Sequence, residues 1–519
     1  MPLPNNPKLT WPPEGWSDIY DDYAEHAAWY GGDMDKLALI YTNRIYSPYY
    51  ETSFNISRNL GEEIKSMVHV PAASDIAGTS AAMLFGEHPK IWIPEAQDDN
   101  AHSDAVAAQE WLDNMINSVE LHSRISDAAD ICSGIGGVFL KVDWDQSLSE
   151  YPIINVAQAD SAVPEFQFGF LKAVTFWKVI EDDGKSVLRL LERHEPGYVL
   201  SGLYQGSDDK LGDNIGLNSR VETAGIQDVV ETGIDGLTCV YIPNIRPNRK
   251  HRGISIGQAD CAGLESLMNS LDYTYTSLLR DIRVGLGRMA APAEYFETDG
   301  AGNWRFDEYR EVYIKLDGVM GRPDASAAEN ITFNQFEIRT QQHLDAAQGF
   351  LRQIYSGAAY SPQSFGLDIQ GNAESGTALK IRERKSIQTT GKKGDYWVPR
   401  LKYIVNAAMQ IARVHLGARL ADYEAEVDLQ DSVESDLATM ATSVEMLNRA
   451  QAVSMETKVR MIHPDWSVEE VNEEVKRIQD DQGMNVPDVT QFGRGNNISD
   501  SNNSSGGFDK NNDENNNNG

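Results

Sequence analysis

The chain has 519 residues, and its 45 Lys and Arg residues are outnumbered by 78 Asp and Glu residues, which gives a formal net charge of −33. Such an acidic chain is unsuited to gripping nucleic acid, because tight binding requires many cationic side chains that neutralise phosphates. The charge is still compatible with a protein along which nucleic acid moves without being bound tightly. The length predicts about two to four domains.

Three cysteines, Cys132, Cys239 and Cys261, lie far apart in the sequence and form no CxxC pair. This usage predicts a reducing compartment and no zinc site. The N-terminus carries neither a basic region nor an apolar signal core, so no secretory signal is expected. Because no apolar run of about 18 or more residues occurs, no membrane span is expected either.

The first third of the chain predicts mainly helices. Residues 1–70 should be helical in pieces after a proline-rich start, and four aromatic residues are expected to anchor the packing: Trp11, Trp16, Tyr20 and Trp29. Residues 74–85 form an apolar segment of small residues, after which GEHPKIWIP predicts a turn and a short strand. Residues 104–131 predict one helix. Its apolar face consists of Ala108, Trp111, Leu112, Met115 and Ile116.

The glycines in GIGGVFLKVDW, residues 134–144, suggest a phosphate-binding loop, and Lys141 resembles a kinase lysine. Neither interpretation is adopted, because GxxxxGK[ST], HRD and DFG are absent from the sequence. A glycine turn before a strand accounts for the segment better. His194 and Glu195 lack a third metal ligand at usable spacing, which favours a structural role for this pair.

Residues 151–206 alternate and are rich in β-branched side chains, which predicts a mixed sheet, and residues 237–244 add a further strand. A basic turn, IRPNRKHRG, follows at 245–253. Residues 257–282 predict a strong helix whose apolar stripe is wide enough to be buried. The stripe consists of Leu264, Leu267, Met268, Leu271, Tyr275, Leu278, Leu279 and Ile282.

A β-rich insert over residues 289–336 separates that helix from a second one over residues 338–356. The candidate strands of the insert are AAPAEYFE, NWRFD, REVYIKL and ITFNQFE. Gly357 should end the second helix, as glycine does at a helix C-terminus. Residues 358–376 are rich in Gly, Ser, Asn and Pro, which predicts a loop. The two helices therefore flank a small β module.

A longer helix is predicted from near Glu374 to Gly417, and Gly391, Gly394 and Pro399 should kink it or split it in two. Residues 374–419 contain ten Lys or Arg and three Asp or Glu. A basic helical element therefore lies within an acidic protein. Such charge runs are usually solvated faces or are paired with acidic neighbours.

Beyond Gly417 the chain is acidic, with 21 Asp or Glu and 7 Lys or Arg from residue 421 to the end. A helix is marked by Leu437, Met440, Val444 and Leu447, and a capping box that begins at Ser467 opens another. After Asn485 the apolar content collapses. The asparagine-rich residues 486–519 are therefore expected to be disordered.

Six stretches, in this order, make the chain resemble the portal proteins of tailed bacteriophages over roughly residues 15–480. The family's early helix and turn resemble PAASDIAGTSAAMLFGEHPKIWIP (71–94), and its wing strands resemble EFQFGFLKAV (165–174) and LERHEPGYVLSGLYQG (191–206). The exit of a stem helix into the clip resembles RMAAPAEYF (288–296), and the tunnel loop with the long helix behind it resembles SPQSFGLDIQGNAESGTALKIRERKS (361–386). The family's C-terminal helices resemble IHPDWSVEEVNEEVKRI (462–478).

The resemblance implies an α+β, portal-type fold with a mixed α/β wing, a two-helix stem, a small β-rich clip, a long kinked helix and a helical crown. The implied parts are the N-terminal wing (1–250), stem helix 1 (251–288), clip (289–336), stem helix 2 (337–357), tunnel loop (358–376), long wing helix (377–420), crown (421–485) and disordered tail (486–519).

The function that the resemblance implies is a ring, usually of twelve subunits, at one vertex of a phage head. Double-stranded DNA would be packaged and ejected through its channel without sequence specificity. Such a protein is not an enzyme, since a separate terminase motor hydrolyses ATP and docks on the clip. The expected partners are the terminase large subunit, the major capsid and scaffold proteins and a head–tail connector protein, with no cofactor, metal or membrane. The protein would reside in the virion, and in the host cytoplasm before assembly.

The resemblance also implies a channel site in the tunnel loop. Its expected lining residues are Ser361, Gln363, Ser364, Phe365, Leu367, Asp368, Gln370, Asn372 and Glu374. Only two of these carry charge, so contact with DNA should be steric rather than ionic. Six basic residues are expected to pair with a neighbouring subunit or to face DNA, and pairing is favoured. They are Lys380, Arg382, Arg384, Lys385, Lys392 and Lys393.

Two other classes of function compete with this interpretation. A different structural ring or head-completion component of a virion is the first alternative. An intracellular enzyme is the second, and it is disfavoured because no carboxylate pair, histidine cluster or nucleophile elbow is evident in the sequence.

Overall fold

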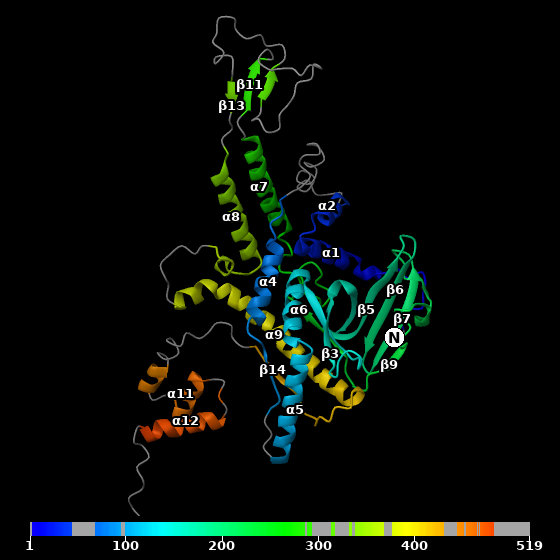
Figure 1. Ribbon diagram of the computed structural model, residues 1–519, viewed down its shortest axis with the longest axis vertical. Helices are drawn as coiled ribbons and strands as arrows, with labels where there is room; N and C mark the ends of the chain where they lie inside the picture. Colours follow the sequence, from blue (N-terminus) through cyan, green and yellow to red (C-terminus); the bar gives the residue numbers. More distant parts are fainter. Residues whose placement is uncertain are drawn as a thin grey trace, which may run out of the picture. The chain divides into compact units, whose positions relative to one another are not determined.

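The computed structural model describes residues 3–43, 68–94, 99–285, 288–292, 313–316, 332–334, 338–367, 376–429, 444–450, 453–463, 466 and 468–481. The chain forms two units, Met1–Ser432 and Val433–Gly519. The first unit combines helices with mainly antiparallel sheets (Figure 1), which confirms the predicted α+β class.

Short helices form the N-terminal part of the first unit. They are the 3-10 turn η1 (Glu14–Trp16), α1 (Ser17–Gly31), α2 (Met34–Asn43) and α4 (Ala72–Phe85). Trp11 and Trp29 are buried, as predicted for packing anchors, whereas Trp16 and Tyr20 are only partly buried. Trp29 also donates a hydrogen bond through Nε1 to the Tyr41 hydroxyl at 2.7 Å. This buried contact helps to hold α2 against α1.

The helix predicted over residues 104–131 is in fact two helices, α5 (Asp99–Ser118) and α6 (Leu121–Ile135). Between them Glu120 adopts a left-handed backbone conformation with φ +53°. A left-handed residue cannot continue a right-handed helix, so the chain changes direction there. Arg124 stabilises the junction by donating a hydrogen bond through Nε to the carbonyl of Val119 at 2.8 Å.

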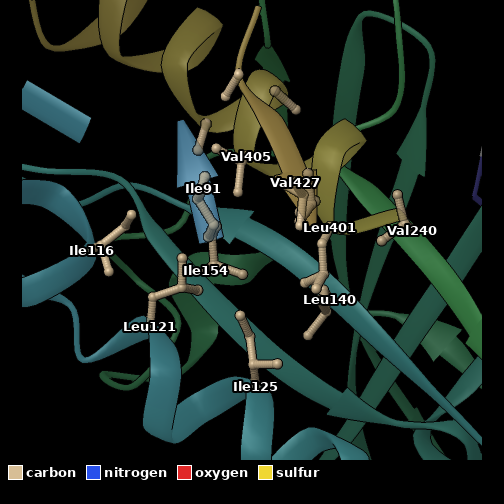
Figure 2. Packing of buried hydrophobic residues seen from close by; sticks show 14 of the residues in the cluster. Ile91, Ile116, Leu121, Ile125, Leu140, Ile154, Val240, Leu401, Val405 and Val427 are labelled. Atoms are coloured by element: carbon tan, nitrogen blue, oxygen red, sulfur yellow. The ribbon is translucent and has the colours of Figure 1, made fainter. Parts of the chain in front are cut away.

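A three-stranded antiparallel sheet in the order β10-β2-β3 lies at the centre of the first unit. It consists of β2 (Gly137–Asp143), β3 (Ile153–Gln158) and β10 (Cys239–Pro243), so the predicted strand after the glycine turn is confirmed. Figure 2 shows Leu140 and Val240 of this sheet beside Leu401 from the long helix α9 (Gly376–His415). Leu121 and Ile125 of α6 belong to the same buried cluster. Helix and sheet therefore share one core.

A short two-stranded ladder closes the edge of this core. The predicted strand β1 (Lys90–Trp92) pairs antiparallel with β14 (Glu426–Asp428), with Ile91 opposite Val427. Both of these side chains are buried. Strand β14 therefore belongs to the first unit, which ends at Ser432.

The larger sheet has six strands: β4 (Ala162–Gln167), β5 (Phe170–Asp182), β6 (Val187–Glu195), β7 (Tyr198–Gly206), β8 (Asp213–Asn214) and β9 (Val229–Glu231). Every pair between these strands is antiparallel, so the predicted mixed sheet is wrong for this part of the chain. The reason is the shortness of the connections from β4 to β7, since a hairpin joins only antiparallel neighbours. The 3-10 turns η3 (Ala159–Ser161) and η4 (Leu217–Ser219) complete this region.

Two helices, α7 (Glu265–Val284) and α8 (Thr340–Gly357), lie side by side (Figure 1) and run antiparallel. Asp281 near the end of α7 pairs with Arg339 at 3.0 Å and with His343 at 3.0 Å at the start of α8. The prediction that the first helix begins at Gly257 is wrong. Gln258 forms an isolated bridge with Ile245, residues 260–263 form turns, and Gly263 has φ +84°.

The apolar stripe of α7 is only partly buried. Met268 and Leu271 of the stripe are buried in a cluster with α1, α4 and α8, whereas Ile282 is more than two-fifths exposed. Tyr273, which lies outside the stripe, is exposed to a similar extent. On α8, Leu344 also remains exposed. The prediction of a fully buried stripe therefore holds only for the first half of α7 within a single chain.

The insert between α7 and α8 contains a three-stranded sheet in the order β12-β11-β13. Its strands are β11 (Arg288–Pro292), β12 (Tyr313–Leu316) and β13 (Thr332–Asn334). Strand β11 pairs in parallel with β12 and antiparallel with β13. The predicted β-rich character is confirmed for these strands, and the candidate strand NWRFD lies outside the described residues.

The long helix α9 runs without interruption over Gly376–His415. Of the two predicted effects of Gly391, Gly394 and Pro399, the split of the helix is therefore wrong, and a kink stays a prediction. A Cβ atom on Gly394 would lie 3.2 Å from the Leu429 side chain, so the glycine permits close approach of the chain that follows β14. Helix packing thus tolerates Pro399 and the glycines, as tertiary context often overrides helix propensity.

The second unit contains α11 (Met455–Ile462) and α12 (Val468–Asp481). Ser454 caps α11, since its hydroxyl accepts a hydrogen bond from the Thr457 amide at 3.2 Å. Helix α12 confirms the helix predicted after Ser467, although Ser467 itself lies outside the described residues. Of the helix predicted around Leu437, only residues 444–450 are described, and the tail 486–519 is not.

All three cysteines are free and buried. Burial raises the pKa of each thiol well above its ordinary value. None of the helices in the described part of the chain is both long enough and apolar enough to cross a bilayer.

Candidate functional site

The segment between α8 and α9 is the site at which the sequence places the channel. The structure describes five of the nine predicted lining residues, from Ser361 to Leu367. The other four, Asp368, Gln370, Asn372 and Glu374, lie outside the described residues.

The described half of this segment forms the 3-10 turn η6 (Pro362–Phe365). Gly366 follows with φ +75°, a conformation that favours glycine, and its amide donates to the carbonyl of Gln363 at 3.0 Å. The amide of Leu367 donates to the carbonyl of Pro362 at 3.1 Å. These bonds close the turn on itself.

An aromatic stack holds the turn against α8. The ring of Phe365 lies 3.8 Å from the ring of Tyr355, with the two planes within 3° of parallel, and the Tyr360 ring meets Phe365 edge-on at 6.0 Å. Leu367 packs against the same buried cluster. Such stacking adds about 0.5–1.5 kcal/mol beyond the burial of apolar area.

Hydrogen bonds also tie the segment to α9. The Ser361 amide donates to Ser386 Oγ at 2.8 Å, and the Ser364 hydroxyl lies 2.9 Å from the same oxygen. Thr389 Oγ1 donates to the carbonyl of Ala359 at 2.6 Å. Residues 361–367 of the predicted loop are therefore packed on both neighbouring helices.

The six predicted basic residues are distributed unequally along α9. Arg384, Lys385 and Lys392 are exposed. Lys385 donates to the carbonyl of Ser356, and Lys392 donates to the carbonyl of Arg246 at 3.0 Å. The side chains of the two remaining N-terminal members lie outside the described residues; these are Lys380 and Arg382.

Lys393 departs from its expected role, because its side chain is 1% exposed. Its Nζ pairs with Asp260 Oδ2 at 2.5 Å and donates to Ser80 Oγ at 2.7 Å. Burial alone would lower the pKa of Lys393, but the Asp260 carboxylate outweighs burial and raises that pKa to about 12. Lys393 therefore stays protonated inside its own subunit, and it is unavailable to DNA or to a second subunit.

Asp260 gathers further donors around this ion pair. Ser133 donates to Oδ2 at 2.6 Å, Asn244 donates to Oδ1 at 2.8 Å and Tyr360 donates to Oδ2 at 3.3 Å. The network joins α4, α6, α9 and the turns before α7 at the base of the candidate site. Sequence reasoning missed Asp260, since a single aspartate in a turn has no motif around it.

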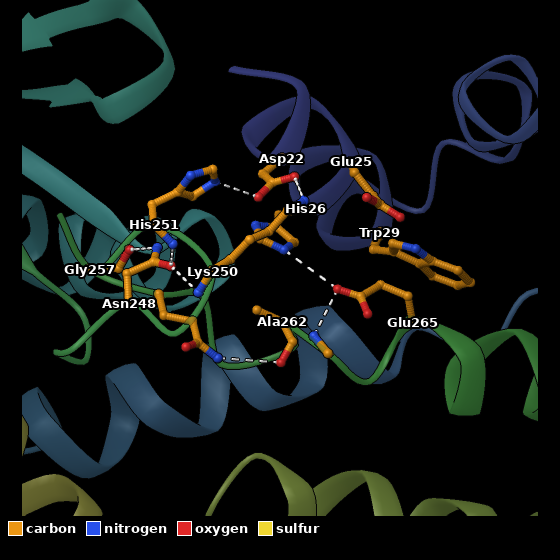
Figure 3. A network of polar contacts seen from close by, with 12 residues as sticks. Asp22, Glu25, His26, Trp29, Asn248, Lys250, His251, Gly257, Ala262 and Glu265 are labelled. Atoms are coloured by element: carbon orange, nitrogen blue, oxygen red, sulfur yellow. Dashed lines mark hydrogen bonds and ion pairs between the residues drawn. The ribbon is translucent and has the colours of Figure 1, made fainter. Parts of the chain in front are cut away.

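A second polar network links α1 to the turns that precede α7 (Figure 3). Asp22 accepts hydrogen bonds from Lys250 and, at 2.9 Å, from His251 Nε2. Burial alone would raise the pKa of Asp22, but these two bonds outweigh it and hold the pKa below its ordinary value. His26 lies 3.6 Å from Glu265, the first residue of α7. A cavity of about 360 Å³ is lined by Asp22, His26, Lys250 and Glu265 of this network.

The residues that suggested a kinase lysine and a metal ligand belong to one structural cluster. Lys141 Nζ lies 2.8 Å and His194 Nε2 lies 2.7 Å from Glu192 Oε1, and His194 Nδ1 contacts Thr238 Oγ1 at 2.6 Å. His194 thus has a structural role, although its partner is Glu192 rather than Glu195. Among the described residues no group of three or more His, Cys, Asp or Glu side chains is placed to hold a metal ion.

The Glu192 carboxylate should make stability depend on acid pH. Burial alone would raise its pKa, but the bonds from His194 and Lys141 lower it from 4.5 to about 2. This shift corresponds to about 3 kcal/mol of stabilisation, which is complete above pH 4.5 and is lost as the pH falls toward about 2. We expect Glu192→Gln to reduce the urea midpoint strongly near pH 7 and much less near pH 3.

The control for this experiment is Glu181→Gln, which removes the exposed pair between Glu181 and Arg220 at 3.2 Å. An exposed pair contributes about 0–1 kcal/mol, so the control should stay close to the unaltered protein at either pH. An equal loss for Glu192→Gln at both pH values would contradict the role assigned to the carboxylate.

A family model described as "Phage portal protein, SPP1 Gp6-like" matches residues 209–488, more than half of the chain. No curated protein sequence matches the chain. Among solved structures, "Neck of native GTA particle computed with C12 symmetry" is 11% identical over 81% of this chain and 94% of that chain, with a TM-score of 0.38. "Virion of native gene transfer agent (GTA) particle" is 9% identical over 75% of this chain and 88% of that chain, with a TM-score of 0.37.

Proposed function

Since the chain belongs to the SPP1 Gp6-like family of phage portal proteins, we propose that it assembles into a closed ring, of twelve copies as the family resemblance implies, at one vertex of a capsid. Double-stranded DNA passes through the ring during packaging and ejection. The protein resides in the virion, and in the host cytoplasm before assembly.

The observation that carries the ring proposal is the incomplete burial of the paired helices α7 and α8. Tyr273, Ile282 and Leu344 expose apolar surface along a helix pair that a single chain leaves uncovered. A head-to-tail contact between copies covers such surface, and a rotation that closes gives a ring. In a portal protein, such a ring has a function, because it forms the channel for DNA.

The channel lining is assigned to the tunnel loop, residues 358–376, of which residues 361–367 serve as the anchored base. Asp368, Gln370, Asn372 and Glu374 then form the part that meets DNA. A net charge of −33 repels phosphates. With few cationic side chains to neutralise DNA phosphates, few counterions are released from DNA, and this release is what drives tight non-specific binding. The loop therefore confines DNA by its bulk and leaves it free to slide.

The basic residues of α9 take different roles in this proposal. Lys380, Arg382 and Arg384 are assigned to pairing with acidic side chains of a neighbouring subunit, with DNA contact as the second possibility. Lys385 and Lys392 already donate to carbonyl groups of their own chain, which favours a local bracing role for them.

The remaining partners follow from the same proposal. The terminase large subunit docks on the clip, residues 289–336, and supplies ATP hydrolysis that this chain does not. A head–tail connector protein docks on the ring after packaging, and the major capsid and scaffold proteins surround the wing.

Native mass spectrometry of the purified chain tests the ring directly. We expect a closed homo-oligomer at micromolar concentration and moderate salt, and images of the same sample should show rings. A chain that remains monomeric under these conditions would overturn the proposal and favour a different head component. A monomer with a turnover activity would favour an enzyme.

A further inference from the structure

The tip of the hairpin between β4 and β5 carries two exposed phenylalanines. Phe168 is 92% exposed and Phe170 is 79% exposed. Two such aromatic side chains at one tip form an apolar surface that their own chain does not cover. Isolated apolar residues on a surface are ordinary, but adjacent aromatic residues at a protruding turn mark an interaction site more often.

The backbone at this tip adds an independent argument. The two-residue turn consists of Phe168 with φ +53° and Gly169 with φ +86°. Both angles are positive, as in the hairpin turn that favours Asn-Gly. A bulky residue in this conformation is strained, and strain of this kind is concentrated where function requires it. Phe168 therefore weakens its own turn and contributes nothing to its own core.

The hairpin tip meets the chain just after the basic turn. A Cβ atom on Gly169 would lie 3.8 Å from Ser255 Oγ, and Phe166 and Ile254 pack against the same buried cluster. Arg252 of that turn is exposed, and within the described residues it forms no ion pair, whereas Arg249 lines the cavity beside Asp22. The tip is thus an aromatic knob with positive charge next to it, on a protein whose net charge is −33.

A complementary hollow is present elsewhere on the first unit. A cavity of about 430 Å³ is lined by Val70, Pro71, Ala72, Ser74, Asp75 and Tyr355, where the start of α4 meets the end of α8. The volume falls within the range of about 300–1,000 Å³ that is typical of binding pockets. Its lining is mostly apolar, and the exposed Asp75 supplies a negative charge, although it also accepts the Tyr355 hydroxyl at 2.7 Å.

We propose that Phe168 and Phe170 of one copy insert into the Val70–Tyr355 cavity of the next copy, with Arg252 beside Asp75. The strands that carry the knob pack on one core cluster and the cavity is lined by residues of another, so we infer that one copy offers the two surfaces to two different neighbours. A contact of this kind is head-to-tail and can close into a ring. The inference rests on the proposed ring and names the surfaces that build it.

The contact would also connect a neighbouring copy to the candidate channel. Tyr355 lines the cavity, and its ring carries Phe365, which anchors the base of the tunnel loop. Insertion of an aromatic side chain therefore touches the residue on which the loop base is stacked. Each copy would support the loop base of the next.

The test uses Phe168→Asn with Phe170→Thr in the full chain. The asparagine restores the favoured Asn-Gly turn and threonine suits a strand, so the monomer should fold at least as well. We expect the ring population in native mass spectrometry to fall by at least about tenfold, since buried aromatic anchors dominate binding energy. The control is Leu148→Ser, which alters another exposed apolar residue and should leave rings intact.

A cavity variant, Ser74→Trp, fills the hollow and should also lose rings while retaining its thermal transition. Mixing the tip variant with the cavity variant leaves one intact knob and one intact cavity per pair. The mixture should therefore give heterodimers and no rings, an outcome specific to a head-to-tail contact.

The outcomes separate this inference from the proposed function. Rings of unaltered abundance in the tip variant would overturn the inference and leave the proposed function standing. The same holds if the tip variant forms rings but loses DNA or capsid association. An unaltered chain that never associates would overturn both.

Discussion

Replacing Lys393 with methionine should lower the free energy of unfolding by about 3–5 kcal/mol. The substitution removes the charge that lies 2.5 Å from Asp260 and compensates it, in a site where both side chains are almost inaccessible. Methionine restores most of the aliphatic volume, so the loss should arise from the carboxylate left in the interior. Urea unfolding, followed at one protein concentration so that assembly does not differ between samples, measures the effect.

Lys392→Met is the matched control, because Lys392 is the adjacent residue on the same helix but lies at the surface. It should change the free energy of unfolding by less than about 1 kcal/mol. The double variant Asp260→Asn with Lys393→Met should recover a large part of the loss, since it removes both buried charges together. Similar losses in Lys392→Met and Lys393→Met would show that the ion pair has no special role.

Deleting residues 368–372 should leave ring assembly intact and reduce packaged DNA to background. This deletion retains Leu367, whose amide bonds to Pro362 and whose side chain packs in the core, so the anchored base survives. The deleted residues are those assigned to steric contact with DNA. Nuclease-protected DNA per assembled head is the measurement, and native mass spectrometry on the same variant reports ring assembly.

A replacement of residues 368–372 by Gly and Ser at equal length serves as the control for chain connection. It should restore the span between α8 and α9 but not the side-chain bulk, and DNA retention should remain impaired. Normal packaging in the deletion variant would refute the assignment of this loop to the channel.

The spacing of apolar residues along the sequence predicted the helices and strands that have one face buried in a core. The apolar repeats that begin at Leu264 and Leu344 predicted both helices of the α7–α8 pair, and alternation predicted the strands around His194. The loop between α8 and α9 followed from its Gly, Ser and Asn content. These signals depend only on neighbouring residues, so a sequence is sufficient to detect them.

Other features depend on contacts between distant segments and were not predictable in this way. Glu120 breaks a helix through its backbone angle, although glutamate is a good helix former. Lys393 has the same local surroundings as Lys392, and only Asp260, more than a hundred residues away, explains its burial. The aromatic stack of Phe365 on Tyr355, which immobilises the base of a loop, likewise has no local signature.

The three buried cysteines have a practical consequence for chemical labelling. The thiolate is the reactive form, and burial both raises the thiol pKa and blocks access for alkylating reagents. The folded chain should therefore not react with maleimide reagents, even with all three native cysteines in place. A cysteine introduced at the hairpin tip becomes the one site of modification, so a fluorophore there reports on its own surroundings alone.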